Sequence, residues 1–318
     1  MDAGLLYQNA RVKSLETTLL GADRLQRVSD ADSIAEATRL LIEAGYPSAD
    51  TCDAMLSAAE KEASLLFKAN TASGYGLELF LLVDDYHNAK VAAKAYYLGG
   101  TKDGYRPEGS LALSLIEESL EKSEYKALPS GIADAFLALD RLKARESLLP
   151  SDVDLTLDKA AFRALAEGRK KAAKVIARYF DLLADLKNIS VAYRAYRAGL
   201  SREKAKEMIL PAGNLSEKDL LKIVDGGEDA AEKIKAEGLV REAIAALKEG
   251  LVAYEVFTDN ALLAILRKER YDMFSPAPIA GLYIGKLREI KNVRLILARI
   301  ANGVDKDIIK GRMRELYV

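Results

Sequence analysis

The sequence predicts an all-α protein made of three similar helical domains. Three observations support this prediction: strong helix formers dominate, prolines leave long proline-free blocks, and one helical pattern occurs three times. Ala, Leu, Glu, Lys and Arg dominate the chain, whereas alternating runs of β-branched or aromatic residues are nearly absent. Helices are therefore expected along most of the chain.

The size and charge of the chain limit its class. Its 318 residues suit two or three domains of roughly 100 to 150 residues each. Half of the residues are hydrophobic and 30% are charged, a composition that argues against disorder. Lys and Arg number 47 against 48 Asp and Glu. Because this balance leaves no excess of positive charge for phosphates, no nucleic acid partner is expected.

Three features predict a cytoplasmic protein. Cys52 is the single cysteine, so it cannot form an internal disulfide and fits a reducing compartment. Residues 1–12 lack the basic flank and apolar run of a signal peptide. The densest apolar stretches, 77–83 and 261–266, are much shorter than the ~20 residues that cross a bilayer, so no transmembrane segment is expected.

Prolines and start signals place the helices in order. Blocks 151–210 and 212–275 contain no proline and can hold long helices. Ser151 after Pro150, Ser201 before a charged turn, and Ser216 before an apolar run each have the form of a helix start. The seven prolines are expected to punctuate helices and not to interrupt them; they are Pro47, Pro107, Pro129, Pro150, Pro211, Pro276 and Pro278.

An internal repeat is the most informative pattern. An acid is followed by an asparagine three positions later and by a glycine eleven positions after that, with periods of about 100 residues. Apolar residues fall at offsets −2, +1, +5 and +8 from each asparagine, which is one stripe of a helix. Copies two and three continue this stripe at offset +12, where copy one has a glycine. Each copy therefore predicts an amphipathic helix that closes at or near its glycine. The motif residues are Asp85, Asn88 and Gly99, then Asp185, Asn188 and Gly199, then Glu289, Asn292 and Gly303.

The repeat also predicts the domain limits and the role of the motif. Its period places boundaries near residues 115 and 215, which gives helical domains 1–115, 116–215 and 216–318. The acid and the asparagine are expected to satisfy polar groups of a neighbouring helix at a bend or junction. A catalytic role is disfavoured, because active sites bring unlike groups together and the motif repeats the same ones.

Histidine and cysteine chemistry is excluded by count. With His87 and Cys52 each alone in the chain, no His/Cys metal site and no histidine-based triad can form. Lys187 and Lys291 stand at the repeat positions equivalent to His87, which predicts a solvated surface residue. No catalytic residue, metal or cofactor is therefore expected.

Two glycine-containing segments do not fit a nucleotide site. Residues 281–286 have three residues between the glycines where a phosphate loop has four, and Leu287 stands where Ser or Thr would bind magnesium. Residues 74–76 lack a third glycine at the required offset, since Leu79 is there. The first segment is thus not expected to bind nucleotide, and the second predicts a hinge or a helix break.

Charged clusters leave one weaker chemical hypothesis. Asp84 and Asp85 are adjacent, so their side chains point about 100° apart on a helix. A helical enzyme that uses carboxylates stays open, and it would require a deep polar pocket with convergent acids of perturbed pKa. The basic clusters at 169–171 and 267–270 are expected to be solvated helix faces.

The C-terminal region carries a family resemblance. Residues 276–296, 302–304 and 312–318 resemble the C subunit of archaeal and bacterial V/A-type ATPases, which is related to the d subunit of eukaryotic V-ATPases. The residues that carry this resemblance are Pro276, Pro278, Ile279, Tyr283, Lys286, Glu289, Ile290, Lys291, Asn292, Val293, Arg294, Ile296, Asn302, Gly303, Val304 and the terminal run Arg312, Met313, Arg314, Glu315, Leu316, Tyr317 and Val318. The start of the chain is similar to the family's first helix through Tyr7, Asn9, Ala10, Arg11, Val12, Glu16, Leu19 and Leu20. The central segment is similar to the family's central motif through Asp85, Asn88 and Lys90.

The resemblance implies a mechanical function. It implies a funnel of three helical domains around a pseudo-threefold axis, peripheral on the cytoplasmic face of the membrane rotor ring. The funnel would receive the rotor shaft made by the D and F subunits and would couple the shaft to the ring without chemistry of its own. No short motif marks the residues of these contacts, and the apolar stripes are expected to form core within each domain. The main alternative is a general helical scaffold or adaptor that binds other helical partners.

Overall fold

The computed structural model describes residues 3–145, 147–234, 236 and 238–318. It is 72% helical, and no strand occurs in these ranges. The prediction of an all-α protein is confirmed. None of the described helices is both long and apolar enough to cross a membrane.

Contacts group the chain into two compact units. The central unit is residues 73–234, and the terminal unit joins residues 1–72 with residues 235–318. Copies one and two of the repeat lie in the central unit, and copy three lies in the terminal unit. The predicted boundaries near 115 and 215 remain a prediction.

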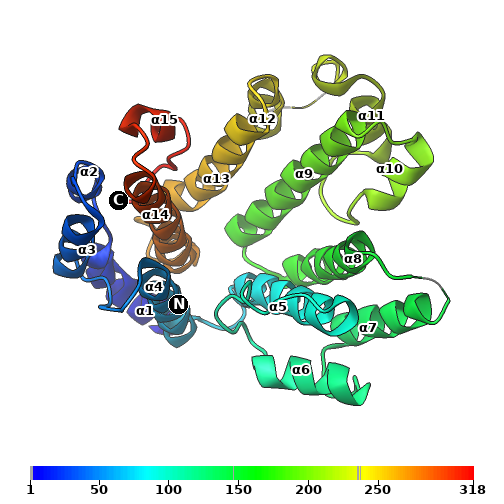
Figure 1. Ribbon diagram of the computed structural model, residues 1–318, viewed down its shortest axis with the longest axis horizontal. Coiled ribbons are helices and arrows are strands. Elements are labelled where there is room, and N and C mark those ends of the chain that lie inside the picture. The colour runs from blue at the N-terminus through cyan, green and yellow to red at the C-terminus, as the bar shows by residue number, and fades with distance from the viewer. Residues whose placement is uncertain (1–2, 146, 235, 237) are drawn as a thin grey trace. The chain divides into compact units, whose positions relative to one another are not determined.

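The central unit is built from helices that pack against one another in pairs. Helix α8 packs against α5 and α7, and α9 packs against α11 (Figure 1). Helix α11 is broken at Gly226–Gly227, where Gly227 has a φ of 59°. The helices of this unit are α5 (Glu78–Leu98), α6 (Leu113–Lys122), α7 (Ser130–Lys143), α8 (Pro150–Gly168), α9 (Lys174–Arg197), α10 (Arg202–Met208), α11 (Glu217–Ala231) and the short 3₁₀ helix η2 (Arg169–Lys171).

The terminal unit is built around its longest helix, α14. Helices α1, α4 and α13 pack along α14, so both ends of the sequence contribute to one core (Figure 1). The helices of this unit are α1 (Ala3–Leu15), η1 (Glu16–Thr18), α2 (Ala22–Ser29), α3 (Ile34–Glu43), α4 (Cys52–Asn70), α12 (Gly238–Lys248), α13 (Leu251–Lys268), α14 (Ala277–Ala301) and α15 (Lys306–Lys310).

Helix starts follow the sequence signals. Ser201 and Ser216 are the N-caps of α10 and α11, and each hydroxyl accepts a hydrogen bond from the backbone N–H three residues later. Pro150 is the first residue of α8, where a missing N–H costs nothing. None of the seven prolines lies in a helix interior. The predicted starts at 201 and 216, and the predicted placement of the prolines, are confirmed.

The three repeat helices are α5, α9 and α14. Each ends within two residues of its motif glycine, which has a φ between 62° and 69°. The left-handed conformation favours glycine at these helix ends. The apolar stripe is buried at offsets −2, +1 and +5, whereas Tyr96 and Tyr196 at offset +8 are 41% and 38% exposed. The first half of each stripe is therefore core, and in copies one and two the second half reaches the surface.

The core of the terminal unit joins residues far apart in sequence. Leu41 and Met55 from the N-terminal helices pack in one cluster with Val293 and Ile296 of α14, and all four are completely buried. Burying side chains of this size contributes about 1.5–3 kcal/mol each. This cluster fixes α14 against α3 and α4.

Candidate functional site

Each motif asparagine binds the backbone of the segment that follows its helix. Its Oδ1 accepts from the N–H of one residue, and its Nδ2 donates to the carbonyl oxygen of the same residue. That residue is Arg106 for Asn88 (2.9 and 3.2 Å), Leu210 for Asn188 (2.8 and 3.1 Å) and Arg314 for Asn292 (2.8 and 2.8 Å). All three asparagines are at most 1% exposed. The side chain thus replaces a backbone partner for a segment that has no helix or strand to pair with.

The two motif aspartates hold the next part of the same segments. Asp85 accepts from the N–H groups of Ser110 (3.0 Å) and Leu111 (2.9 Å). Asp185 accepts from those of Asn214 (2.7 Å) and Leu215 (2.8 Å). Both leucines lie two residues before the next helix, α6 or α11. The aspartates therefore fix where these helices begin.

The acid of copy three binds the N-terminal region. Glu289 accepts from the N–H of Leu20 at 2.6 Å. Leu20 lies two residues before α2, the same offset that Leu111 and Leu215 have from their helices. Helix α2 therefore takes in copy three the place that α6 and α11 take in the other copies.

A second set of contacts gives the same correspondence. Two residues after Asn88, Lys90 forms ion pairs with Asp154 and Asp158 of α8. Two residues after Asn292, Arg294 pairs with Asp53 and Glu60 of α4, at 3.2 and 3.0 Å. Helix α4 therefore has the same position relative to α14 that α8 has relative to α5. The third copy is completed by residues from the first 72 of the chain.

The acids are bound by fixed donors. Burial raises the pKa of Asp185, although the N–H groups of Leu215 and Asn214 oppose this shift. Glu289 also accepts from the Tyr46 hydroxyl (2.7 Å) and from Lys286 (2.6 Å). Burial raises the pKa of Tyr46 far above its ordinary value, and the charge of Glu289 adds to the shift. These contacts give the acids a structural role.

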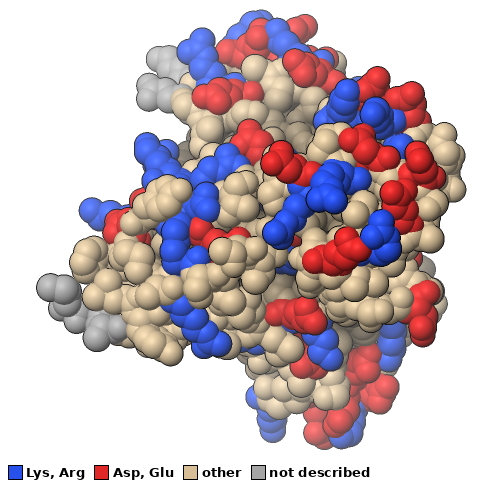
Figure 2. Space-filling model, turned by 90° about the vertical axis from the view of Figure 1, so that its left-hand side faces the viewer, with Lys and Arg blue, Asp and Glu red and all other residues tan. Residues whose placement is uncertain are grey.

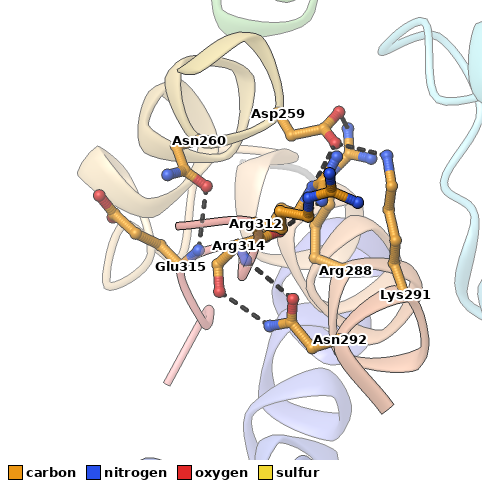
Figure 3. A network of polar contacts seen from close by, with 8 residues as sticks. All are labelled: Asp259, Asn260, Arg288, Lys291, Asn292, Arg312, Arg314 and Glu315. Carbon is orange, nitrogen blue, oxygen red and sulfur yellow. Dashed lines mark hydrogen bonds and ion pairs between the residues drawn. The ribbon is translucent and has the colours of Figure 1, made fainter. Parts of the chain in front are cut away.

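A polar network holds the C-terminal strap, which we define as residues 312–318 (Figure 3). Asn292 binds the backbone of Arg314 from one side, and Asn260 accepts from the N–H of Glu315 at 2.9 Å on the other. The side chain of Arg314 reaches Asp259 at 2.9 Å. The strap is thereby tied to both α13 and α14.

Asp259 is the centre of this network (Figure 3). Besides Arg314 it contacts Arg288 (2.8 Å) and Lys291 (2.7 Å), so three cations surround one carboxylate that is 13% exposed. Burial by itself would raise the pKa of Asp259, but the three cations outweigh burial and lower it. The carboxylate is therefore held ionised as a junction between the strap and two helices.

Two glycines of α14 make room for the strap. A Cβ added to Gly281 or Gly285 would lie 2.4 or 2.5 Å from an atom of Tyr317. The Tyr317 ring therefore lies directly on the helix backbone, and it is 2% exposed. Arg270 donates to the Tyr317 carbonyl oxygen and to Glu16, which links the strap to η1, directly after α1. The two glycines therefore serve the packing of the strap on α14.

His87 differs from its prediction. It is half-buried, and its Nε2 lies 2.9 Å from the carbonyl oxygen of Gly104. Burial lowers the pKa of His87, and the charge of Arg106 lowers it further. The prediction of a solvated surface residue was wrong because the segment after α5 folds back over this side chain.

The other residues that the sequence singled out do not form a common site. Asp84 pairs with Arg106 (3.3 Å), whereas Asp85 binds backbone N–H groups, so the two carboxylates do not converge. Residues 74–76 lie in the non-helical connection between α4 and α5, and Gly74 and Gly76 both have a φ of 84°. Over the described ranges, no three His, Cys, Asp or Glu side chains are close enough together to hold a metal ion.

The basic clusters are paired with acids. Arg169 forms an ion pair with Asp181, Arg267 with Glu315 and Arg270 with Glu16. On the face shown in Figure 2, Lys and Arg stand among Asp and Glu, and neither sign covers the surface. Such a mixed face agrees with the near-neutral composition of the chain.

Sequence reasoning assigned no contact to Asp259, Tyr317 or Leu20, although Tyr317 and Leu20 are among the residues that carry the family resemblance. These three residues bind partners from distant segments, and no periodic pattern marks them. Leu20, Leu111 and Leu215 each precede a helix by two residues, but this correspondence depends on helix starts that are known only from the structure.

Comparison with known proteins covers nearly the whole chain. The sequence profile of the family described as ATP synthase (C/AC39) subunit matches residues 8–312. The C subunit of the A-type ATP synthase of Methanococcoides burtonii is 24% identical over 96% of this chain and 93% of its own length. The C subunit of the V-type sodium ATPase of Enterococcus hirae is 23% identical over 97% of this chain and 98% of its own length. The corresponding A-type ATP synthase protein of Pyrococcus abyssi is 25% identical over 98% and 90%. With a match of this extent, the chain belongs to the ATP synthase (C/AC39) subunit family, whose V/A-type members include these relatives.

Proposed function

We propose that the chain is a non-catalytic central-stalk component of a V/A-type ATPase or ATP synthase. It is a socket that couples the rotor shaft, made by the D and F subunits, to the membrane rotor ring. The observation that carries this proposal is the family match over residues 8–312, together with V/A-type relatives that align along nearly their whole length. The coupling serves rotary ion transport.

The contacts of the repeat motif support the proposal that the chain transmits mechanical load. In each copy, a buried asparagine and a buried acid fasten non-helical segments to a long helix through several hydrogen bonds. Bonds to buried charged groups are worth about 1.5–3 kcal/mol each and resist local opening. Three such junctions suit a body that must transmit torque without changing shape.

The proposal includes a funnel, in which the three copies surround a pseudo-threefold axis and accept the shaft. The ring then lies on the other side of the funnel, at the cytoplasmic face of the membrane, and the chain is peripheral. A socket of this kind should bury more than ~1,200 Å² with each partner.

The test is a binding experiment with the full chain. The purified chain is mixed with the D–F shaft and, separately, with the detergent-solubilised ring from the same cell, and captured complexes are weighed by mass photometry. Calorimetry with ATP and ADP is run on the chain alone. The proposal predicts capture of both partners and no heat of nucleotide binding.

Two outcomes oppose the proposal. Capture of neither partner leaves the general helical adaptor as the better explanation. Saturable nucleotide binding by the chain alone would contradict a purely mechanical role. In the control, the capture by a tagged chain is repeated with an excess of untagged chain, which should compete for the partner and lower specific capture.

A further inference from the structure

A pocket lies in the terminal unit, and no residue of the strap is among those that line it. Its volume is about 300 Å³, it is partly open to solvent, and it lies between α1, η1, α4 and α14. Its walls are mostly apolar, with Val12, Ala63, Phe67 and Leu282 among the lining residues. Cavities of this size are at the lower end of those that bind small molecules.

One wall of the cavity is flat and aromatic. The rings of Phe67 and Tyr283 are stacked, with centroids 4.5 Å apart and planes 16° from parallel. Both residues line the cavity, and both are buried. A flat apolar ligand can pack beside this pair with aromatic contact.

The cavity has a buried acceptor that needs a donor. Asn70 lines it and is 1% exposed. Its Nδ2 donates to the carbonyl oxygen of Leu66 at 2.7 Å, whereas its Oδ1 has no hydrogen-bond partner within the described part of the chain. Buried polar atoms are normally satisfied, so this oxygen favours a ligand that carries an O–H or N–H.

The charges at the cavity favour a neutral ligand. Lys286 lines the cavity, but its ammonium group already contacts Glu289 at 2.6 Å and lies 4.1 Å above the centre of the Tyr46 ring. Glu62, also in the lining, is exposed and would repel an anion. A carboxylate ligand would in addition meet the acceptor oxygen of Asn70 without a proton to share.

The size of the cavity sets the size of the ligand. An apolar cavity of roughly 150 Å³ accepts benzene, with six carbon atoms, so twice that volume accepts about ten to twelve non-hydrogen atoms. We propose that this cavity binds a neutral bicyclic or similarly compact molecule whose hydroxyl or N–H donates to Asn70 Oδ1. The inference does not depend on the rotor function.

The experiment compares two probes that differ in one donor. Titration calorimetry on the full chain uses 2-naphthol, which has a hydroxyl, and naphthalene, which has none. The cavity should bind 2-naphthol one to one, and naphthalene about tenfold more weakly, because only 2-naphthol satisfies Asn70. In Asn70→Leu, 2-naphthol should lose about tenfold in affinity while naphthalene keeps its own.

A second variant tests the location. Ala63→Phe fills the cavity and should abolish binding of both probes, whereas Ala54→Phe, at an exposed position of the same helix, should leave both unchanged. Circular dichroism checks that each variant folds. The proposal is overturned if 2-naphthol fails to bind the wild-type chain at about 1 mM, or if its binding survives in folded Ala63→Phe. Equal affinity of the two probes for the wild-type chain overturns the role of Asn70.

Discussion

At the scale of the residue, the motif asparagine is suited to its position because a short side chain carries both an acceptor oxygen and a donor NH₂ group. It offers an irregular segment the same pair of groups that a peptide bond would offer. An aspartate lacks the donor. The buried amide therefore satisfies two backbone groups of Leu210, or of its counterparts, without bringing a charge into the core.

Replacing Asn188 by leucine should lower the free energy of unfolding by about 3 kcal/mol, because the N–H and C=O of Leu210 lose their partner in a buried site. Urea denaturation measures the change. The matched control is Asn302→Leu at the end of α14, since Asn302 is exposed and donates to the Ala298 carbonyl oxygen of its own helix. An equal loss in both variants would contradict the structural role of the motif.

Asp259→Asn should lower the free energy of unfolding at pH 7 by about 2–4 kcal/mol, because three cations lose their counter-ion. The folded pKa of Asp259 lies below its unfolded value of about 3.9. The contribution of its charge is thus complete above about pH 5 and is lost as the pH falls through the folded pKa.

Urea denaturation at pH 7 and pH 3 tests this dependence. The difference between wild type and Asp259→Asn should shrink at the lower pH. The control is Asp53→Asn, because Asp53 is exposed at 91% and its ion pair contributes little. A difference that is independent of pH would mean that Asp259 acts through packing alone.

At the scale of the element, α14 combines two kinds of packing. Its first turns carry glycines that let Tyr317 approach the backbone, and its middle carries the buried residues of the terminal core. The proline at its second position and the glycine after its end set its length. The helix is thereby held by the strap at one part and by α3 and α4 at another.

Gly281→Ala should destabilise the chain by about 1–2 kcal/mol, although alanine favours helix by about 1 kcal/mol, because the new Cβ would clash with Tyr317. In a Tyr317→Ala background the same change should become stabilising, since the ring is gone. Chemical denaturation of the wild type, the two single variants and the double variant gives the coupling free energy between Gly281 and Tyr317. The control is Gly311→Ala, where φ is −69° and the space is open, so the effect should be neutral or favourable. Additive effects at Gly281 and Tyr317 would contradict the contact.

Much of the secondary structure could be predicted from local signals. The serines at 201 and 216 mark helix starts through their own side chains, and the prolines exclude helix interiors, so both are visible in the sequence. The contact between Gly281 and Tyr317 could not be predicted, because the positions are far apart in sequence and neither belongs to a periodic pattern. The prediction for His87 was wrong for the same reason, because the partial burial of this side chain depends on the loop at Gly104.

At the scale of the whole molecule, the contacts of the third repeat helix reach the N-terminal region of the chain. Leu20 and Glu289 are 269 residues apart in sequence, yet their hydrogen bond has the same place in copy three as local bonds have in the other two. Sequence periodicity located the three acids but could not show which segment each one binds. In the terminal unit, the N-terminal helices and α14 are one mechanical body.

Hydrogen exchange should detect this connection. The Leu20 amide is buried and bound to Glu289, so it should exchange as slowly as the Leu215 amide in the second copy. The Glu289→Gln variant should speed exchange at Leu20 and leave Leu215 unchanged. NMR-detected exchange on the full chain gives both rates. Rapid exchange at Leu20 in the wild-type chain would show that the N-terminal segment is not fixed to copy three.

The most direct measurement of the central claim is coupling in the reconstituted complex. A V/A-type ATPase is assembled in vesicles with and without this chain, and ATP hydrolysis and ion transport are recorded together. The account predicts that the complex without the chain hydrolyses ATP but moves no ions, and that adding the purified chain restores transport. Full ion transport in its absence, or ATP hydrolysis that never becomes coupled to transport after the chain is added, would contradict the account.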